Sequence, residues 1–282
     1  MPESPEVQEL ATFLAARTRG VRVSGFDIAL PKLVKTSELG PSDLVGRRIT
    51  DVRRAGKMID IRTADDDGGV LSAVVHFGHD GWVLWHDLAP DGIARAGEAT
   101  LMARIRLENG SGFDLTDAGQ WKMLTVHIVP DAQDVPAVAK LGLDPLAEPP
   151  DLERFAGILS GRRKQIKALL QDQSEFAGIG NAYSDEILHA AKLSPIAHAS
   201  SLSAEQVATL ASATWRVLGD AASARHGLPP DQLRPAKHAA LRVHRKTGEA
   251  CPVCGDRIRQ FSFSGAAAQY CPTCQTGGAL LA

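Results

Sequence analysis

The sequence predicts an α+β protein with an N-terminal antiparallel β-sandwich flanked by helices, an all-helical domain and a small C-terminal β-hairpin domain. Three observations predict this fold. Short apolar stretches separated by Gly- and Asp-rich turns fill residues 21–128, helical periodicity fills 151–224, and all four cysteines lie in the last 32 residues. The domain ranges that we expect are 1–130 for the sandwich, 131–150 for a linker, 151–240 for the helical domain and 241–282 for the cysteine-bearing domain.

The composition is that of an ordinary globular protein. The chain has 282 residues, of which 44% are apolar and 23% charged, and this length suffices for two or three domains with their own cores. It contains no stretch of about eighteen uncharged apolar residues, and its N-terminus lacks the apolar region of a secretory signal. We therefore expect a cytoplasmic protein with no membrane partner.

Residues 4–18 are expected to form the first helix. Ser4 suits the N-cap position and Pro5 suits the first turn. The apolar residues that recur at the spacing of one helix face are Val7, Leu10, Ala11 and Leu14. A helix with this start would hold Glu3 and Glu6 near its positive end.

The chain begins Met1-Pro2-Glu3. Methionine before a small residue is normally removed, which would leave the secondary amine of Pro2 beside the Glu3 carboxylate. An α-amino group has a pKa near ~8 against ~10.4 for lysine, so part of it is an unprotonated nucleophile at neutral pH. Attack of such an amine on a sugar C1′ would give a cationic iminium. Many chains begin Met-Pro without a catalytic role, and these residues alone favour that simpler interpretation.

The middle of the chain changes from strands to helices. The predicted strands are 21–23, 49–52, 58–61, 71–75, 82–85, 101–107, 112–115 and 123–126. The predicted helices that follow the proline-rich connection are 151–160, 162–172, 182–192 and 203–224. Residues 225–240 contain one glycine and three prolines, so we expect a mobile loop there.

The four cysteines form two Cys-x-x-Cys pairs separated by sixteen residues. They are Cys251, Cys254, Cys271 and Cys274. This spacing is typical of a four-cysteine zinc ribbon, in which four thiolates surround one Zn²⁺. Two disulfides are the alternative, which a chain without a secretory signal disfavours. A site closed by four protein ligands indicates a structural metal rather than a catalytic one.

The charge of the chain is uneven. The formal net charge is −2, yet residues 234–259 carry seven basic and two acidic side chains. A local basic face can bind phosphates whatever the total charge is, although a solvated surface would have the same composition.

A glycine-rich turn interrupts the helical region at Gly178-Ile179-Gly180-Asn181. The two glycines permit a tight turn, and Asn181 opens the next helix. Exposed amides and an Asn side chain at a helix start favour anions, so a DNA phosphate is a candidate ligand. An ordinary helix turn with an Asn cap would have the same sequence.

Taken together and in order, these motifs resemble the formamidopyrimidine-DNA glycosylase/endonuclease VIII family, the helix-two-turn-helix glycosylases of base-excision repair. The likeness covers nearly the whole chain. The matching segments are Pro2 to Val7, Gly56-Lys57, His76 to Gly81, Leu141 to Leu146, Ala177 to Tyr183 and the cysteine pairs. The resemblance implies an all-α helix-two-turn-helix domain and a zinc-ribbon hairpin behind the sandwich.

The resemblance also implies a bifunctional glycosylase and lyase that flips a damaged nucleotide out of duplex DNA. Pro2 would attack C1′ and form a Schiff base. Glu3 would act as general acid and then move protons during β- and δ-elimination. Lys57 would hold a phosphate near the lesion, and Glu6 would orient the site.

The partner that the resemblance implies is double-stranded damaged DNA, bound by a monomer. The expected DNA-binding residues are His76, His79, Gln120, Trp121, Lys167, Gly180, Asn181, Arg257 and Arg259. Zinc, held by the four cysteines, is the one expected cofactor.

Two departures from the family pattern concern the DNA contacts. The hairpin position that carries an arginine in the family is Ala266 here, which removes a charge-assisted phosphate contact that Arg257 and Arg259 could replace. His79 stands at the first position that fills the hole left by the flipped base, and Gln120-Trp121 replaces a later Arg-Phe pair. We therefore expect an altered lesion or opposite-base preference, although Trp121 could also be a core residue.

Two other classes remain open on the sequence. A paralogue that binds damaged DNA without cutting it would fit the missing arginine and Arg-Phe pair, but it would not need Pro2, Glu3 and Lys57. A zinc-ribbon adaptor for protein partners would leave the Met-Pro-Glu start unexplained.

Overall fold

The computed structural model describes residues 1–90, 100–263 and 266–281, without the side chains of Phe263 and Ala266. Its contacts divide the chain into two compact units. The first, here called the sandwich unit, contains Met1–Pro2, Glu6–Lys140 and Arg225–Arg234. The second, here called the helical unit, contains Glu3–Pro5, Leu141–Ala224 and the chain from Pro235 onward. The division falls inside the first helix and inside a helix near residue 235.

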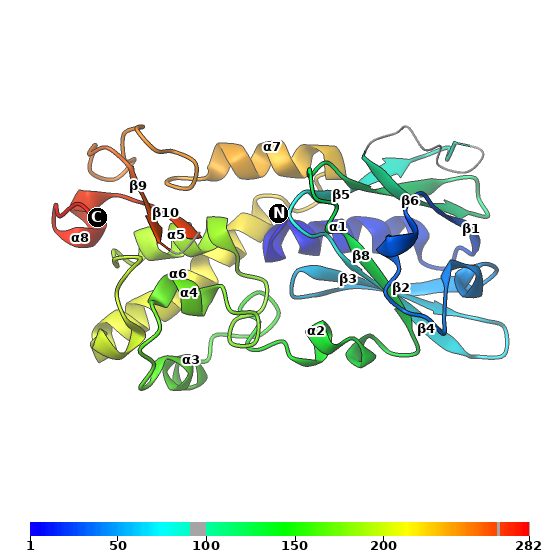
Figure 1. Cartoon of the computed structure of the whole chain (residues 1–282), viewed down its shortest axis with the longest axis horizontal. Coiled ribbons are helices and arrows are strands. Elements are labelled where there is room, and N and C mark those ends of the chain that lie inside the picture. The colour runs from blue at the N-terminus through cyan, green and yellow to red at the C-terminus, as the bar shows by residue number, and fades with distance from the viewer. Residues whose placement is uncertain (91–99, 264–265, 282) are drawn as a thin grey trace. The chain divides into compact units, whose positions relative to one another are not determined.

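The sandwich unit contains two four-stranded antiparallel sheets (Figure 1). One has the order β1-β6-β7-β5, with β1 Val23–Ile28, β6 Leu101–Leu107, β7 Gly112–Asp117 and β5 Gly81–His86. The other has the order β2-β3-β4-β8, with β2 Arg48–Ala55, β3 Met58–Ala64, β4 Val70–His76 and β8 Thr125–Val129. Alternating buried side chains of the two sheets form one apolar core. The predicted α+β fold with an antiparallel sandwich is confirmed.

Two of the predicted strands are displaced along the chain. The strand expected at 21–23 begins at Val23 and runs to Ile28, and the strand expected at 123–126 is Thr125–Val129. In both cases, pairing with a neighbouring strand decides the limits: β1 lies against β6, and β8 lies against β4. Local apolar patterning could not supply that information.

Helix α1 spans Ser4–Thr18, as predicted. Val7, Leu10 and Leu14 are at most 1% exposed and belong to the sandwich core. The expected cap is wrong, because the buried Ser4 hydroxyl has no hydrogen-bond partner within the described residues. The Ser4 N–H instead donates to the Gly178 carbonyl at 2.9 Å.

The helical unit is built around α5 and α6 (Figure 1). Its helices before residue 225 are α3 Leu152–Leu159, α4 Ile166–Leu170, α5 Asn181–Ala190 and α6 Ala204–Ser223. A capping box starts α6: Ser203 Oγ accepts from the Gln206 N–H, and the Gln206 side chain accepts from the Ser203 N–H. The short helix α2, Pro136–Ala139, belongs to the sandwich unit.

The loop expected over 225–240 is wrong, because Pro230–Ala240 forms helix α7 (Figure 1). Pro230 occupies the first turn, where a missing N–H costs nothing, but Pro235 lies inside the helix. Tertiary contacts offset that defect. Leu233 is fully buried in the sandwich core, and Arg234 stacks 4.3 Å from the Trp82 ring while donating to the Asp80 and Gly81 carbonyls.

The C-terminal part of the helical unit is a hairpin followed by one short helix. Strand β9, Arg259–Phe263, pairs antiparallel with β10, Ala266–Tyr270, and α8 spans Pro272–Thr276. Strand β10 and helix α8 both contact α5. A small cluster of Val243, Ile258, Cys251 and Cys271, with Cys274 packed against it, forms its core.

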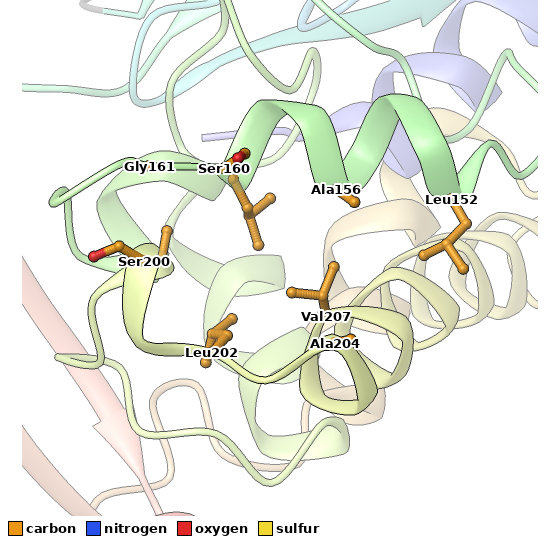
Figure 2. Close-up of a pocket in the computed structure, with 10 residues that line it drawn as sticks. Leu152, Ala156, Ser160, Gly161, Ser200, Leu202, Ala204 and Val207 are labelled. Carbon is orange, nitrogen blue, oxygen red and sulfur yellow. The ribbon is translucent and has the colours of Figure 1, made fainter.

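A cavity of about 380 Å³ lies in the helical unit between α3 and the start of α6 (Figure 2). It is lined by leucine, alanine, valine, serine and glycine residues, with no titratable group among them. The lining of this cavity therefore offers no acid or base group. Within the described ranges, no helix is long and apolar enough to cross a membrane.

Candidate active site and DNA-binding surface

The carboxylate of Glu3 lies at the N-terminus of α5. Its Oε2 accepts hydrogen bonds from the Gly180 N–H at 2.6 Å and the Tyr183 N–H at 3.2 Å, and its Oε1 accepts from the Ala182 N–H at 2.9 Å. Three backbone donors and the positive end of a helix favour the ionised carboxylate. Glu3 is only 3% exposed and is bound to a turn 177 residues further along the chain.

The two glycines of this turn have different tasks. Gly178 has φ +86°, a left-handed conformation suited to glycine, and its carbonyl accepts from the Ser4 N–H. At Gly180, an added Cβ would lie 2.6 Å from Glu3 Cδ, so only glycine leaves room for the carboxylate. The anion expected at this helix start is therefore Glu3, and the Gly180 amide has no N–H left for a DNA phosphate.

Lys167 of α4 is buried beneath the same turn. Its ammonium donates to Asp185 Oδ1 at 2.5 Å, Ser184 Oγ at 3.0 Å and the Asn181 carbonyl at 3.2 Å. Burial lowers the pKa of Lys167, while Asp185 and then Glu3 raise it. All three N–H groups of the Lys167 ammonium donate to acceptors inside the protein. None is left for the contact with DNA that the sequence predicts for Lys167.

Asn181 remains the exposed polar residue of the turn. Its Oδ1 accepts from Gln171 Nε2 at 3.2 Å, which directs the Asn181 amide nitrogen away from this contact. An amide donor fixed at an exposed helix start can bind a phosphate oxygen. The geometry is consistent with the DNA contact predicted for Asn181.

Pro2 and Glu6 belong to the sandwich unit. Pro2 is buried. The Glu6 carboxylate is fully buried, and the Arg225 Nε lies 3.7 Å from Glu6 Oε1. A buried carboxylate paired with a guanidinium fixes the first turns of α1 against the segment that begins at Arg225.

Lys57 and two histidines gather at one end of the sandwich unit. Lys57 is the half-buried residue of the turn between β2 and β3, and His76 ends β4. Burial lowers the pKa of His76, and the charges of Lys57 and His79 lower it further. His76 Nδ1 accepts from the Gly78 N–H at 3.2 Å, so the proton of the neutral ring is on Nε2. His79 itself is exposed.

Gln120 and Trp121 lie on the exposed loop between β7 and β8. Trp121 is 78% exposed, so the alternative of a core residue is wrong. The loop is nevertheless held firmly, because the Asp117 carboxylate accepts from the N–H groups of Gly119, Met123 and Leu124. It packs on the His79 loop, since a Cβ on Gly78 would lie 2.6 Å from Met123 Cβ.

The four cysteines come together as the sequence predicts. All four Sγ atoms lie within 4.8 Å of one another, with 3.9 Å between Cys251 and Cys274 and 3.3 Å between Cys254 and Cys271. Four thiolates at about 2.3 Å from Zn²⁺ require sulfur–sulfur distances of roughly 3.8 Å, so the cluster fits zinc. Burial raises the pKa of Cys274 to about 11, and a cation is needed to hold such thiols as thiolates.

Arg257 and Arg259 are both exposed on the β9 arm of the hairpin. They are two residues apart, which places them on the same side of an extended chain. Ser264, Gly265 and the side chain of Ala266, at the hairpin tip, lie outside the described residues.

Sequence reasoning missed two charged residues of the helical unit. The carboxylate of Glu186, on α5, accepts from the N–H groups of Arg242, Val243 and His244 and so fixes the chain that enters the zinc hairpin. Lys237 of α7 lies 3.7 Å from Glu3. The position of Glu186 between apolar residues Tyr183 and Ile187 could have signalled the first, but nothing in the predicted loop signalled the second.

Three family models cover most of the chain. Residues 1–122 match the formamidopyrimidine-DNA glycosylase N-terminal domain, 141–228 match its H2TH domain, and 248–277 match the zinc finger found in FPG and IleRS. A formamidopyrimidine-DNA glycosylase of Pelotomaculum thermopropionicum is 31% identical over 284 residues, which cover 98% of this chain and 99% of that protein. The chain belongs to the formamidopyrimidine-DNA glycosylase family. The resemblance inferred from the motifs is confirmed.

Other members of the family agree with this assignment. The formamidopyrimidine-DNA glycosylase of Mycolicibacterium smegmatis is 33% identical, with 98% of this chain and 97% of that protein covered. An uncharacterized formamidopyrimidine-DNA glycosylase-like protein of Mycobacterium tuberculosis is 52% identical over 128 residues, 45% of this chain and 81% of that protein. Lactococcus lactis Fpg, in a complex with DNA containing an abasic site, has a TM-score of 0.84 at 25% identity, with 97% and 99% of the chains covered.

Proposed function

We propose that this chain is a base-excision-repair DNA glycosylase and abasic-site lyase that acts as a monomer on damaged double-stranded DNA. The observation that carries the proposal is the fixation of Glu3 at the helix-two-turn-helix segment by three backbone hydrogen bonds. The sequence places the Pro2 amine directly before this fixed carboxylate. Solved structures of similar proteins contain DNA with an abasic site, Fapy-dG or carbocyclic 8-oxo-G.

Removal of Met1 would generate the nucleophile. The Pro2 nitrogen would bond to C1′ while the bond between C1′ and the damaged base breaks, and the base would leave with a proton. Opening of the C1′–O4′ bond then gives the iminium, with a proton transferred to O4′. Loss of a C2′ proton expels the 3′ phosphate by β-elimination, and δ-elimination expels the 5′ phosphate.

Glu3 would contribute mainly as a carboxylate. Its backbone donors favour the charged form, which stabilises the positive charge that develops on the sugar and can accept a proton during elimination. Lys57 would hold a phosphate, and neutral His76 would donate its Nε2–H to another. Glu6 would keep the start of α1 in place through Arg225.

His79, Gln120 and Trp121 would set the lesion or opposite-base preference. An exposed indole on a loop fixed by Asp117 can stack in the gap that a flipped base leaves. Asn181, Arg257 and Arg259 would bind the phosphates. The zinc ion would be structural, because its four protein ligands leave no position for a substrate.

Borohydride trapping on an abasic-site duplex tests the proposal. We expect a covalent adduct with the mature chain, and mass spectrometry should show that the chain has lost Met1. Acylation of the terminal amine should abolish the adduct. No adduct with the mature chain, or an adduct that survives acylation, would exclude this mechanism. Tight binding without base release or strand cleavage would instead select the alternative, a damaged-DNA-binding paralogue.

A further inference from the structure

Helix α7 brings a second charged side chain to the catalytic carboxylate. Lys237 is only 6% exposed, and its Nζ lies 3.7 Å from Glu3 Oε1. The same ammonium lies 4.7 Å from the centre of the Tyr183 ring. All three residues belong to the helical unit. This segment, expected to be a mobile loop, therefore supplies a cation at the proposed active site.

Lys237 is better placed than Lys167 to balance the charge of Glu3. Lys167, on α4, also faces Glu3, but its ammonium is bound by Asp185 at 2.5 Å and by two further oxygens. Its positive charge is thus largely compensated by Asp185. The amine of Pro2 precedes Glu3 directly in the chain. Lys237 makes an ion pair with Glu3, with its Nζ 3.7 Å from Glu3 Oε1.

Tyr183 fixes the geometry of this pair. Its backbone N–H donates to Glu3 Oε2, and its ring attracts the Lys237 ammonium through a cation–π contact. One residue of α5 thereby holds the carboxylate and the ammonium together. Removing two charges from water is costly, so a buried pair of this kind is weak support for stability alone and marks a functional site.

We propose that Lys237 is a positioning residue for base excision, whose ammonium orients the Glu3 carboxylate and keeps it ionised as positive charge develops on the sugar. The inference rests on the function proposed above for Glu3. An opposite charge within a few ångströms favours the ionised form of a carboxylate. Removing the Lys237 charge should therefore move the titration of Glu3 to higher pH and slow base release.

The titration of Glu3 can be followed by carbon-13 NMR of carboxyl-labelled glutamate, with the Glu3 signal assigned by its loss in Glu3→Gln. In Lys237→Met we expect the midpoint to rise by about 1 pH unit, a tenfold change in the ionisation constant. Lys237→Arg should restore most of the original midpoint. Lys246→Met, which removes a cation paired with Glu249 on the surface, should leave the midpoint unchanged.

Single-turnover kinetics provide the second readout. Lys237→Met should lower the rate of base release by about tenfold with a smaller change in the KM for lesion DNA, and Lys237→Arg should recover activity. A Glu3 midpoint that stays the same in Lys237→Met, or that moves equally in Lys237→Arg, would overturn the inference. An effect on KM and salt dependence alone would assign Lys237 to phosphate binding and also overturn it. If the unaltered chain releases no base, the proposed function fails, while the NMR titration still decides the ion pair.

Discussion

The amide of Gly180 donates a 2.6 Å hydrogen bond to the carboxylate of Glu3, although 177 residues separate them in the chain. The N-terminus of α5 thus binds a carboxylate of the same chain, at the turn where the sequence predicts a DNA phosphate. A Cβ at position 180 would occupy the space of the Glu3 side chain.

Gly180→Ala should therefore disable the enzyme without unfolding it. The added methyl group would displace Glu3, and a misplacement of about 1 Å at a reacting group can cost on the order of 100-fold in rate. Base release from a lesion-containing duplex is the measurement.

Gly219→Ala is the matched control, because Gly219 lies inside α6 with nothing within 4 Å of the new Cβ. It should keep full activity and gain about 0.5–1 kcal/mol of stability. Full activity of Gly180→Ala would show that the position of Glu3 is not critical.

Removal of zinc should unfold the hairpin while the sandwich remains folded. The small core of the hairpin consists largely of the cysteines themselves, so the metal supplies its folding free energy. We expect one zinc per chain by dye titration, and a loss of DNA affinity by fluorescence anisotropy after chelation. Circular dichroism should retain the β-sheet signal. Unchanged DNA affinity in the metal-free chain would contradict this assignment.

His76 should make stability depend on pH. Because folding lowers the pKa of His76 below its ordinary 6.5, the unfolded chain binds more protons than the folded one in that range. The stabilisation is therefore present above pH 6.5 and is lost as the pH falls through the folded value. Urea unfolding between pH 7.5 and 5.5 should show a smaller loss in His76→Asn than in the unaltered chain. An equal loss in both chains would refute the predicted environment of His76.

Trp121→Ala should weaken lesion binding but not folding. Because the indole is 78% exposed, its loss should change the free energy of unfolding by less than about 0.5 kcal/mol. A stacked base contributes roughly 1–3 kcal/mol, which corresponds to at least a fivefold loss of affinity for lesion DNA. Leu88→Ala, at an even more exposed apolar residue, is the control and should leave affinity unchanged. Equal affinities of Trp121→Ala and the unaltered chain would exclude stacking.

Local signals in the sequence predicted the fold where each element carries its own pattern. Helix α1 has the predicted limits because its apolar spacing and its proline define it within one segment. The cysteine cluster was equally predictable, since ligand spacing alone fixes it. Helix α7 was not predictable, because Pro235 disfavours a helix. The contacts of Leu233 and Arg234 that stabilise the helix are made with residues far away in the sequence.

The sequence indicated which residues lie at the candidate site, but it did not indicate which groups those residues contact. The glycine turn correctly indicated an anion, but periodicity could not show that the anion is Glu3 rather than a phosphate. The positive charge of Lys167 suggested a contact with DNA. In the structure, its ammonium instead donates a hydrogen bond to Asp185, eighteen positions further along the chain. Contacts between residues this far apart in the chain cannot be recognised from a single sequence.

The bond between Glu3 and Gly180 also has a consequence for biosynthesis. Ribosomes add about 5–20 residues per second, so roughly 10–35 s pass between the synthesis of the first turn of α1 and that of its docking turn. During this interval the backbone donors that bind Glu3 have not been synthesised, and an aminopeptidase has access to Met1. Met1 can thus be removed before the backbone donors that hold Glu3 have been synthesised.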